Sequence, residues 1–91
     1  MSYPVHNTGK VHDQGDGTFT CTYKNNKGIL VSPGTANGTA TLKMFSYPGG
    51  GEDGDTFGIA WTANTRPFVI PIRIKAVTAF TGTAASITEL L

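Results

Sequence analysis

The chain has 91 residues, a formal net charge of +1 and 14% charged residues, well below the roughly 25% of an average soluble domain. This length favours one small domain, and the dispersed Lys and Arg residues lack the clustering that nucleic-acid binding needs. A single cysteine excludes an intrachain disulfide and a cysteine-only zinc site, and no apolar stretch approaches the roughly 20 residues of a membrane span.

Threonine is the commonest residue, ahead of 12 glycines. Thr is β-branched and favours strands, whereas Gly, Asn and Pro favour turns. The composition therefore predicts an all-β protein with many turns. The amino terminus has no charged segment followed by an apolar run, so we expect no signal peptide.

The amino-terminal part of the chain contains little hydrophobic periodicity, and glycines interrupt any regular element. We therefore expect an extended arm over residues 1–17, with room for a short strand near Val5 or Val11. A β-domain over residues 18–91 follows. Arms of this kind are poorly ordered unless they dock on something.

Residues 18–24 alternate, with Phe19, Cys21 and Tyr23 on one face and polar residues on the other, which predicts a strand. Residues 25–28 tolerate positive φ and predict a four-residue hairpin loop. The chain would then return antiparallel to the first strand.

The returning strand covers residues 28–32 and is stopped by Pro33-Gly34. Asn37-Gly38 is the strongest short hairpin signal in the chain. Residues 39–45 alternate again and predict a strand with Ala40 on its apolar face. Leu42 and Met44 share that face.

The segment over residues 48–55 is rich in glycine and acidic residues and predicts a loop. Residues 57–63 predict another strand, and residues 64–67 predict the turn that follows it. The inward face of this strand is expected to hold Phe57, Ile59, Trp61 and Ala63.

The longest period-2 pattern runs over residues 68–80, with Pro71, Arg73 and Lys75 on the polar face. Its apolar face would hold Phe68, Ile70, Ile72, Ile74, Ala76 and Phe80. Residues 81–83 predict a tight turn into a short closing strand. Because proline cannot donate to a sheet ladder, we expect the long strand to be an edge or to carry a bulge.

Six or seven short strands joined by turns, without any helical pattern, predict the fold. We expect a small, single-domain, antiparallel β-sandwich or a jelly-roll-like barrel.

Two acidic segments, residues 13–17 and 52–55, carry carboxylates at spacings that a calcium ion could use. Neither matches an EF-hand loop, and ordinary β-turns contain the same residues. His6, His12 and Asp13 could share a metal ion or relay a proton, but histidines in an arm without Cys or Glu nearby are more typical of a surface. We therefore expect no metal and no cofactor.

Cys21 lies between two aromatic residues on an apolar strand face, which indicates a small core residue rather than a nucleophile. No Ser-His-Asp set and no pair of carboxylates on flanking strands can be placed. The sequence therefore predicts a protein that is not an enzyme.

Trp61 is in phase with its apolar neighbours, which predicts a core position. Phe45 is out of phase with the inward residues of its strand, and Tyr47 leads into the glycine loop. Exposed aromatic rings suit either a protein contact surface or a sugar site, and the sequence leaves both open.

Residues 70–77 (IPIRIKAV), followed by residues 81–84 (TGTA), resemble the carboxyl-terminal end of small virion proteins of tailed phages and gene transfer agents. Members of the spike-base type close with an apolar-Pro-Ile-Arg-Val strand, a Gly-Thr-Thr turn and a terminal apolar strand. Ala84 stands here where a second Thr is usual, and the likeness covers the final quarter of the chain. The resemblance implies a virion component of the head, the spike base or the tail.

The residue pattern and the resemblance together predict a non-enzymatic structural component of a bacteriophage virion, made in the host cytoplasm. We expect a capsid decoration (cement) protein or a spike-base protein. Its expected partners are the major capsid protein or other virion proteins and further copies of itself, as a homo-oligomer that could be a trimer. Low charge suits such a role, because the centres of interfaces are depleted in charged residues. The expected interface residues are Tyr3, Phe45, Tyr47, Pro71, Arg73 and Lys75.

Two alternatives remain open at this point. One is a carbohydrate-binding β-domain involved in host attachment, and the other is a β-domain with some other partner.

Overall fold

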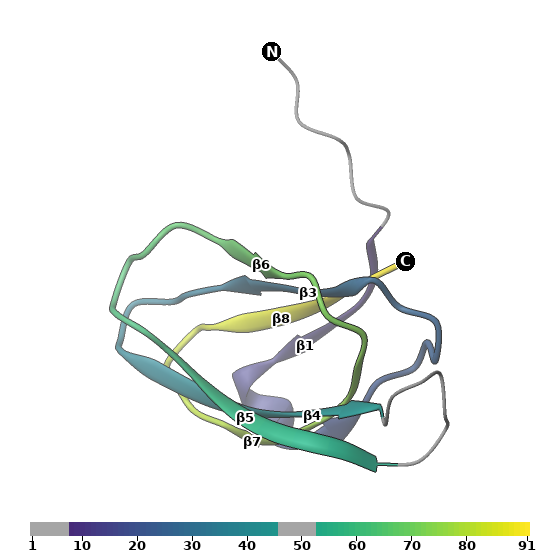
Figure 1. Cartoon of the computed structure of the whole chain (residues 1–91). Helices are drawn as coiled ribbons and strands as arrows, with labels where there is room; N and C mark the ends of the chain where they lie inside the picture. The colour runs from purple at the N-terminus through teal and green to yellow at the C-terminus, as the bar shows by residue number, and fades with distance from the viewer. Residues whose placement is uncertain (1–7, 46–52) are drawn as a thin grey trace.

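The structure, a computed structural model, describes residues 8–45 and 53–91. Eight strands in these ranges form two four-stranded antiparallel sheets that face each other as two layers (Figure 1). Sheet A has the strand order β1-β8-β3-β6, and sheet B has the order β2-β7-β4-β5. The all-β sandwich expected from the sequence is confirmed, with eight strands in place of six or seven.

The strands are β1 (Thr8–Asp13), β2 (Phe19–Thr20), β3 (Gly28–Ser32), β4 (Gly38–Phe45), β5 (Asp53–Trp61), β6 (Phe68–Ile70), β7 (Ile74–Phe80) and β8 (Ser86–Leu90). A three-residue 3-10 turn, η1 (Gln14–Asp16), joins β1 to β2. Across residues 8–45 and 53–91, no helix has the length and apolar character that crossing a membrane requires.

The strand pairing is that of one long hairpin rolled up on itself. β1 pairs with β8, β2 with β7, β3 with β6, and β4 with β5. Rolling this hairpin brings β3 beside β8 and β4 beside β7, which completes the two sheets. This order is that of an eight-stranded jelly roll.

Two connections that the sequence predicts as hairpins, at residues 25–28 and 37–38, and the tight turn predicted at residues 81–83 join strands of opposite sheets. β3 ends at Ser32 and β7 at Phe80, as expected from the turn residues that follow them, whereas β2 ends at Thr20 rather than at residue 24. At all three places the chain crosses to the other layer. Turn residues indicate that a strand stops nearby, but they do not determine which strand it pairs with. The pairing depends on which strand faces must be buried together. The hairpin predictions at residues 25–28 and 37–38 are therefore wrong, whereas a turn and a closing strand do follow Phe80.

The side chain of Asn26 explains the first crossing. It is 3% exposed. Its Nδ2 donates to the carbonyls of Tyr23 and Ile74, and its Oδ1 accepts from the N–H groups of Gly28 and Ile74. A residue predicted to form a hairpin loop thus ties the chain between β2 and β3 to the first residue of β7.

The predicted long strand over residues 68–80 is divided into two. β6 is an edge strand of sheet A and β7 lies inside sheet B, so residues 71–73 cross between the layers. Pro71 is exposed in this crossing, and Ile72, expected to be inward, is 43% exposed. Because proline lacks an N–H, it ends β6 rather than continuing a ladder.

The burial pattern of β7 differs from strict alternation. The register of β7 against β4 shifts at Lys75 and again at Thr78. Each bulge adds one residue and reverses which side chains point inward beyond it. The buried positions therefore fall three apart, at Ile74, Val77 and Phe80, instead of at every even position.

β1 belongs to sheet A, so the β-domain includes residues that precede the predicted boundary at residue 18. β1 pairs with β8 at the edge of sheet A, and the strand expected near Val11 is confirmed. His12, expected at the surface of an arm, is 5% exposed because β1 places it opposite Ile87 on the inner face of the sheet. The surface prediction for His12 is wrong. His6 lies outside the described residues.

The two acidic segments have different outcomes. Residues 13–17 form the expected turn, in which the N–H of Asp13 donates to a side-chain oxygen of Asp16 at 3.0 Å. Residues 53–55, expected in a loop, belong to β5. The rest of that predicted loop lies outside the described residues.

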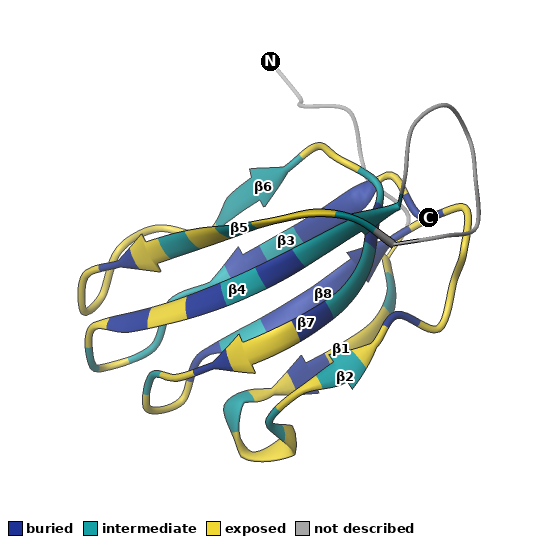
Figure 2. Cartoon of the chain, turned by 60° about the horizontal axis from the view of Figure 1, so that its bottom comes forward, coloured by how far each residue is buried: buried dark blue, intermediate teal, exposed yellow. Residues whose placement is uncertain are grey.

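The core fills the space between the sheets and holds the side chains that alternation places inward. Figure 2 shows exposed and buried bands alternating along the strands of sheet B. Cys21 and Trp61 are buried, as expected, while Phe57 and Ile59 are half-buried on edge strand β5 and Ala63 is exposed in the turn. The fully buried large side chains include Ile29, Val31, Leu42, Ile74, Val77, Ile87, Glu89 and Leu90.

Candidate functional site

Three of the six predicted interface residues gather around one pocket. Phe45, Arg73 and Lys75 line a cavity of about 340 Å³ together with Thr20, Cys21, Thr22 and Lys24, and we name it the basic pocket. Pro71 is exposed nearby in the chain but does not line it. Tyr3 and Tyr47 lie outside the described residues.

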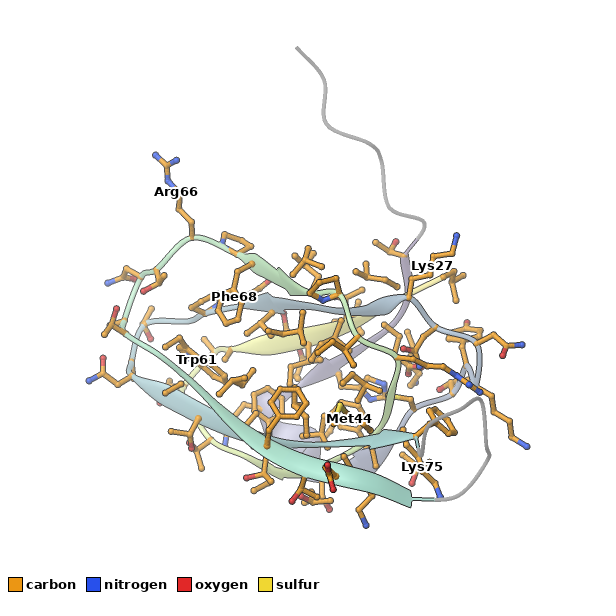
Figure 3. All side chains as sticks on the ribbon, in the orientation of Figure 1. Lys27, Met44, Trp61, Arg66, Phe68 and Lys75 are labelled. Atoms are coloured by element: carbon orange, nitrogen blue, oxygen red, sulfur yellow. The ribbon has the colours of Figure 1, made fainter. Side chains whose placement is uncertain are left out.

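The basic pocket forms where three segments meet at the end of the sandwich that carries Lys75 (Figure 3). Phe45 ends β4, Arg73 ends the crossing from β6 to β7, and Lys24 lies between β2 and β3. The hydrogen bonds of Asn26 to Ile74 hold the second and third segments together. The N–H of Cys21 donates to the carbonyl of Lys75 at 2.8 Å, which joins two of the segments that line the pocket.

Arg73 is held at two points. Its guanidinium carbon lies 4.1 Å from the centroid of the Phe45 ring, within the range of a cation–π contact. Its Nε donates a hydrogen bond to the carbonyl of Lys24. The terminal nitrogens of Arg73 make no hydrogen bond to other residues within 8–45 and 53–91.

A buried hydrogen-bonded pair, His12 and Glu89, lies behind the pocket. His12 Nε2 is 2.6 Å from Glu89 Oε2, and the Glu89 side chain is fully buried. The other carboxylate oxygen accepts from the N–H of Tyr23 at 3.0 Å. The His12 ring stacks on Phe19, with centroids 3.6 Å apart and planes 4° from parallel.

Opposing effects act on the Glu89 carboxyl. Burial alone would raise its pKa, but hydrogen bonds from His12 and from the backbone N–H groups of Thr22 and Tyr23, with the charge of His12, hold the pKa below its ordinary value. Glu89 is therefore ionised at neutral pH inside the sandwich, with both of its oxygens bonded.

Cys21 borders the pocket but is no nucleophile. Burial, and secondarily the negative charge of Glu89, raise the pKa of its thiol to about 12. Because the thiolate is the reactive form, Cys21 stays an unreactive thiol at neutral pH. Among the described residues, no three His, Cys, Asp or Glu side chains are placed to hold a metal ion.

A second depression lies at the opposite end, between edge strands β5 and β6. It is open, has a volume of about 670 Å³ and is lined by Asn37, Ala60, Trp61, Thr62, Thr65 and Phe68. Its polar groups already bond one another: Asn37 accepts from the N–H of Ala63, and the Thr62 and Thr65 hydroxyls are 2.7 Å apart. This depression offers few free polar groups to a ligand.

Sequence reasoning missed two residues of this region. Lys24 was read as an ordinary polar strand position, and nothing about its neighbours signals a pocket. Glu89 sits in the run Thr88-Glu89-Leu90, where its even spacing from Ile87 is the one sign that it shares the inward face. Comparison of the chain with models of known protein families, with curated proteins and with solved structures finds no match.

Proposed function

We propose that this chain is a non-enzymatic structural subunit of a tailed-phage virion, a capsid decoration or spike-base protein that assembles with copies of itself and with neighbouring virion proteins. The carboxyl-terminal likeness over residues 70–84 and the low charge content support this role. Jelly rolls also serve as viral capsid domains. One fold can host many functions, so the fold alone is not enough to support an assembly role. The main support comes from a surface that is suited to assembly.

That surface is the free edge of β5. Natural edge strands are usually short, bulged, or protected by Lys or Pro. Three of the four sheet edges follow this rule: β2 has two residues, β6 has three and precedes Pro71, and β1 has a bulge and Lys10. β5 has nine residues without Lys, Arg or Pro, and within the described chain it pairs with β4 alone.

The exposed edge of β5 is therefore the place where a neighbouring strand would add to sheet B. The bulge of β5 lies at its start, between the pairs Phe45–Asp53 and Lys43–Thr56, and the strand is regular from Thr56 to Trp61. Strand addition satisfies the free N–H and C=O groups of such an edge. A small domain also gains stability from any partner that binds only its folded form.

Gly58→Lys tests this proposal. Gly58 is exposed, and a Cβ there would meet nothing closer than the Ala40 carbonyl at 3.9 Å, so a lysine fits without strain. Its charge would block strand addition. We expect light scattering to show an oligomeric wild-type protein and a monomeric Gly58→Lys variant, whose binding to emptied capsids is at least about tenfold weaker.

Ala79→Lys is the matched control. Ala79 is exposed on central strand β7, and both Ala79 and Gly58 stand opposite Thr41 of β4 on the outer face of sheet B. The control therefore adds the same charge to the same face but not to the edge, and it should still assemble. A wild-type protein that is strictly monomeric and does not bind emptied capsids would contradict the proposal, as would equal loss of assembly in both variants.

The carbohydrate-binding alternative gains less support from the described residues. Stacking on a neutral sugar needs an exposed ring face. Trp61 is 5% exposed and the Phe45 ring already carries the Arg73 guanidinium. We therefore do not propose a neutral-sugar site.

A further inference from the structure

We propose that the basic pocket binds a small organic oxyanion, a carboxylate or a phosphate ester on a hydroxylated molecule, through the guanidinium of Arg73. The proposal does not depend on the virion role. It rests on three features of the pocket: a fixed arginine, an excess of positive charge, and a concave shape with free hydroxyl groups.

Arg73 is oriented before any ligand arrives. Its guanidinium packs over the Phe45 ring, and its Nε donates a hydrogen bond to the Lys24 carbonyl. The two terminal nitrogens remain available in the planar geometry that matches the two oxygens of a carboxylate or phosphate. Because the side chain is already ordered, binding an anion loses little conformational entropy.

The described lining of the pocket is positively charged. Lys24 and Arg73 contribute cations, and none of the seven described lining residues is Asp or Glu. Glu89, the buried carboxylate behind Cys21, is already bonded through both oxygens. Cys21 remains a neutral thiol, so it adds no negative charge to repel an anion.

The shape and polarity of the pocket fit more than a bare ion. A volume of about 340 Å³ lies at the lower end of the range for small-molecule sites. The hydroxyls of Thr20 and Thr22 line it and make no hydrogen bond to other described residues. Since a hydroxyl both donates and accepts, these groups suit the hydroxyls of a sugar acid or a sugar phosphate.

Isothermal titration calorimetry at low ionic strength with four probes tests the inference. Glucuronate supplies a carboxylate, glucose 6-phosphate supplies a phosphate ester, glucose is the neutral counterpart, and inorganic phosphate is the bare anion. We expect at least one of the two acids to bind about tenfold or more tightly than both glucose and inorganic phosphate. The acid that binds identifies the oxyanion.

Arg73→Gln should weaken the binding of that acid at least about tenfold, because a charge-assisted bidentate contact is lost. Arg66→Gln is the control: it makes the same change in net charge at an exposed residue that points away from the sandwich at the other end (Figure 3). It should leave affinity unchanged.

Lys24→Gln gives an independent check if Arg73→Gln disturbs folding. Arg73 is anchored to the backbone carbonyl of Lys24, which glutamine also supplies, so this variant removes a pocket cation and keeps the anchor. We expect a severalfold loss of affinity. Absence of binding by either acid, equal binding of glucose or inorganic phosphate, or acid binding that survives both pocket variants would overturn the inference.

Discussion

The two ends of the sandwich interior bury polar groups in opposite ways. At the end near the basic pocket, the ionised carboxylate of Glu89 is hydrogen-bonded to His12 and also accepts backbone N–H groups. At the other end, the indole Nε1 of Trp61 is buried without a hydrogen-bond partner among the described residues. Figure 3 places Trp61 and Lys75 at these opposite ends.

The glycines around Trp61 account for its burial. A Cβ at Gly38 would lie 2.4 Å from the indole ring, and one at Gly82 would lie 3.2 Å from it. The backbone therefore approaches the ring closely, and Phe80 packs against it in an edge-to-face arrangement with centroids 6.2 Å apart. The charged end depends on bonded partners, whereas the aromatic end depends on close contact, so the two ends should respond to different substitutions.

The largest loss of stability is expected from Glu89→Ala. Removing the carboxylate leaves His12 without its partner and leaves the backbone N–H groups of Thr22 and Tyr23 without this acceptor. Breaking a buried pair in this way costs about 3–5 kcal/mol, a large part of the stability of a small domain. Urea unfolding followed by tryptophan fluorescence measures the change.

Thr88→Ala is the control for that experiment. Thr88 neighbours Glu89 in β8 and is also nearly buried, at 7% exposed, but it lies on the opposite face of sheet A. We expect a change of about 1 kcal/mol or less. If the two variants lose equal stability, the hydrogen-bonded pair of His12 and Glu89 contributes no more to the free energy of unfolding than ordinary packing in β8.

The second-largest loss of stability is expected at the aromatic end, from Gly38→Ala. The added methyl group would overlap the indole ring, so Trp61 or the start of β4 must move. Overpacking of this kind costs about 1–3 kcal/mol. Gly58→Ala serves as the matched control, because the same methyl group in β5 would meet nothing closer than the Ala40 carbonyl oxygen at 3.9 Å. Differential scanning calorimetry should show a lower Tm for the first variant alone.

The sequence predicts the strands of this fold better than their partners. β3, over residues 28–32, and β4 begin and end within a residue of their predicted bounds, since β-branched alternation and turn residues are local signals. The neighbours were wrong at each supposed hairpin. Asn26 and Asn37 illustrate why: both were read as turn residues, yet their side chains bond backbone groups distant in sequence.

The candidate site was predicted only in part, because alternation along a strand is a local signal. Phe45, Arg73 and Lys75 were expected to face outward, and the structure brings them to one pocket. Alternation alone could not predict that Lys24 lines the pocket, because Lys24 meets Arg73 only where residues 71–73 cross between the sheets. Nor could it supply the pairing of His12 with Glu89, whose residues lie at opposite ends of the chain. Pairing over such sequence distances follows from topology rather than from local pattern.

The smallest expected effect is on the stability of the protein in acid. It distinguishes the end that holds Glu89 from the end that holds Trp61. The pKa of Glu89 is held below its ordinary value of about 4.5, so the stability that this shift supplies is present above pH 4.5 and is lost as pH falls through the lower, folded-state pKa. Each unit of displacement corresponds to about 1.4 kcal/mol.

The comparison is between the wild type and the double variant His12→Gln/Glu89→Gln, measured by urea unfolding from pH 5 down to pH 3. The double variant removes both titratable side chains of the pair, so the difference between the two slopes reports what the pair contributes. The wild type should lose more stability than the double variant as the pH falls. Gly38→Ala, altered at the aromatic end, should keep the wild-type slope. Parallel slopes for the wild type and the double variant would mean that the backbone N–H groups and His12 do not favour the ionised form of Glu89, and the contrast between the two ends would then rest on packing alone.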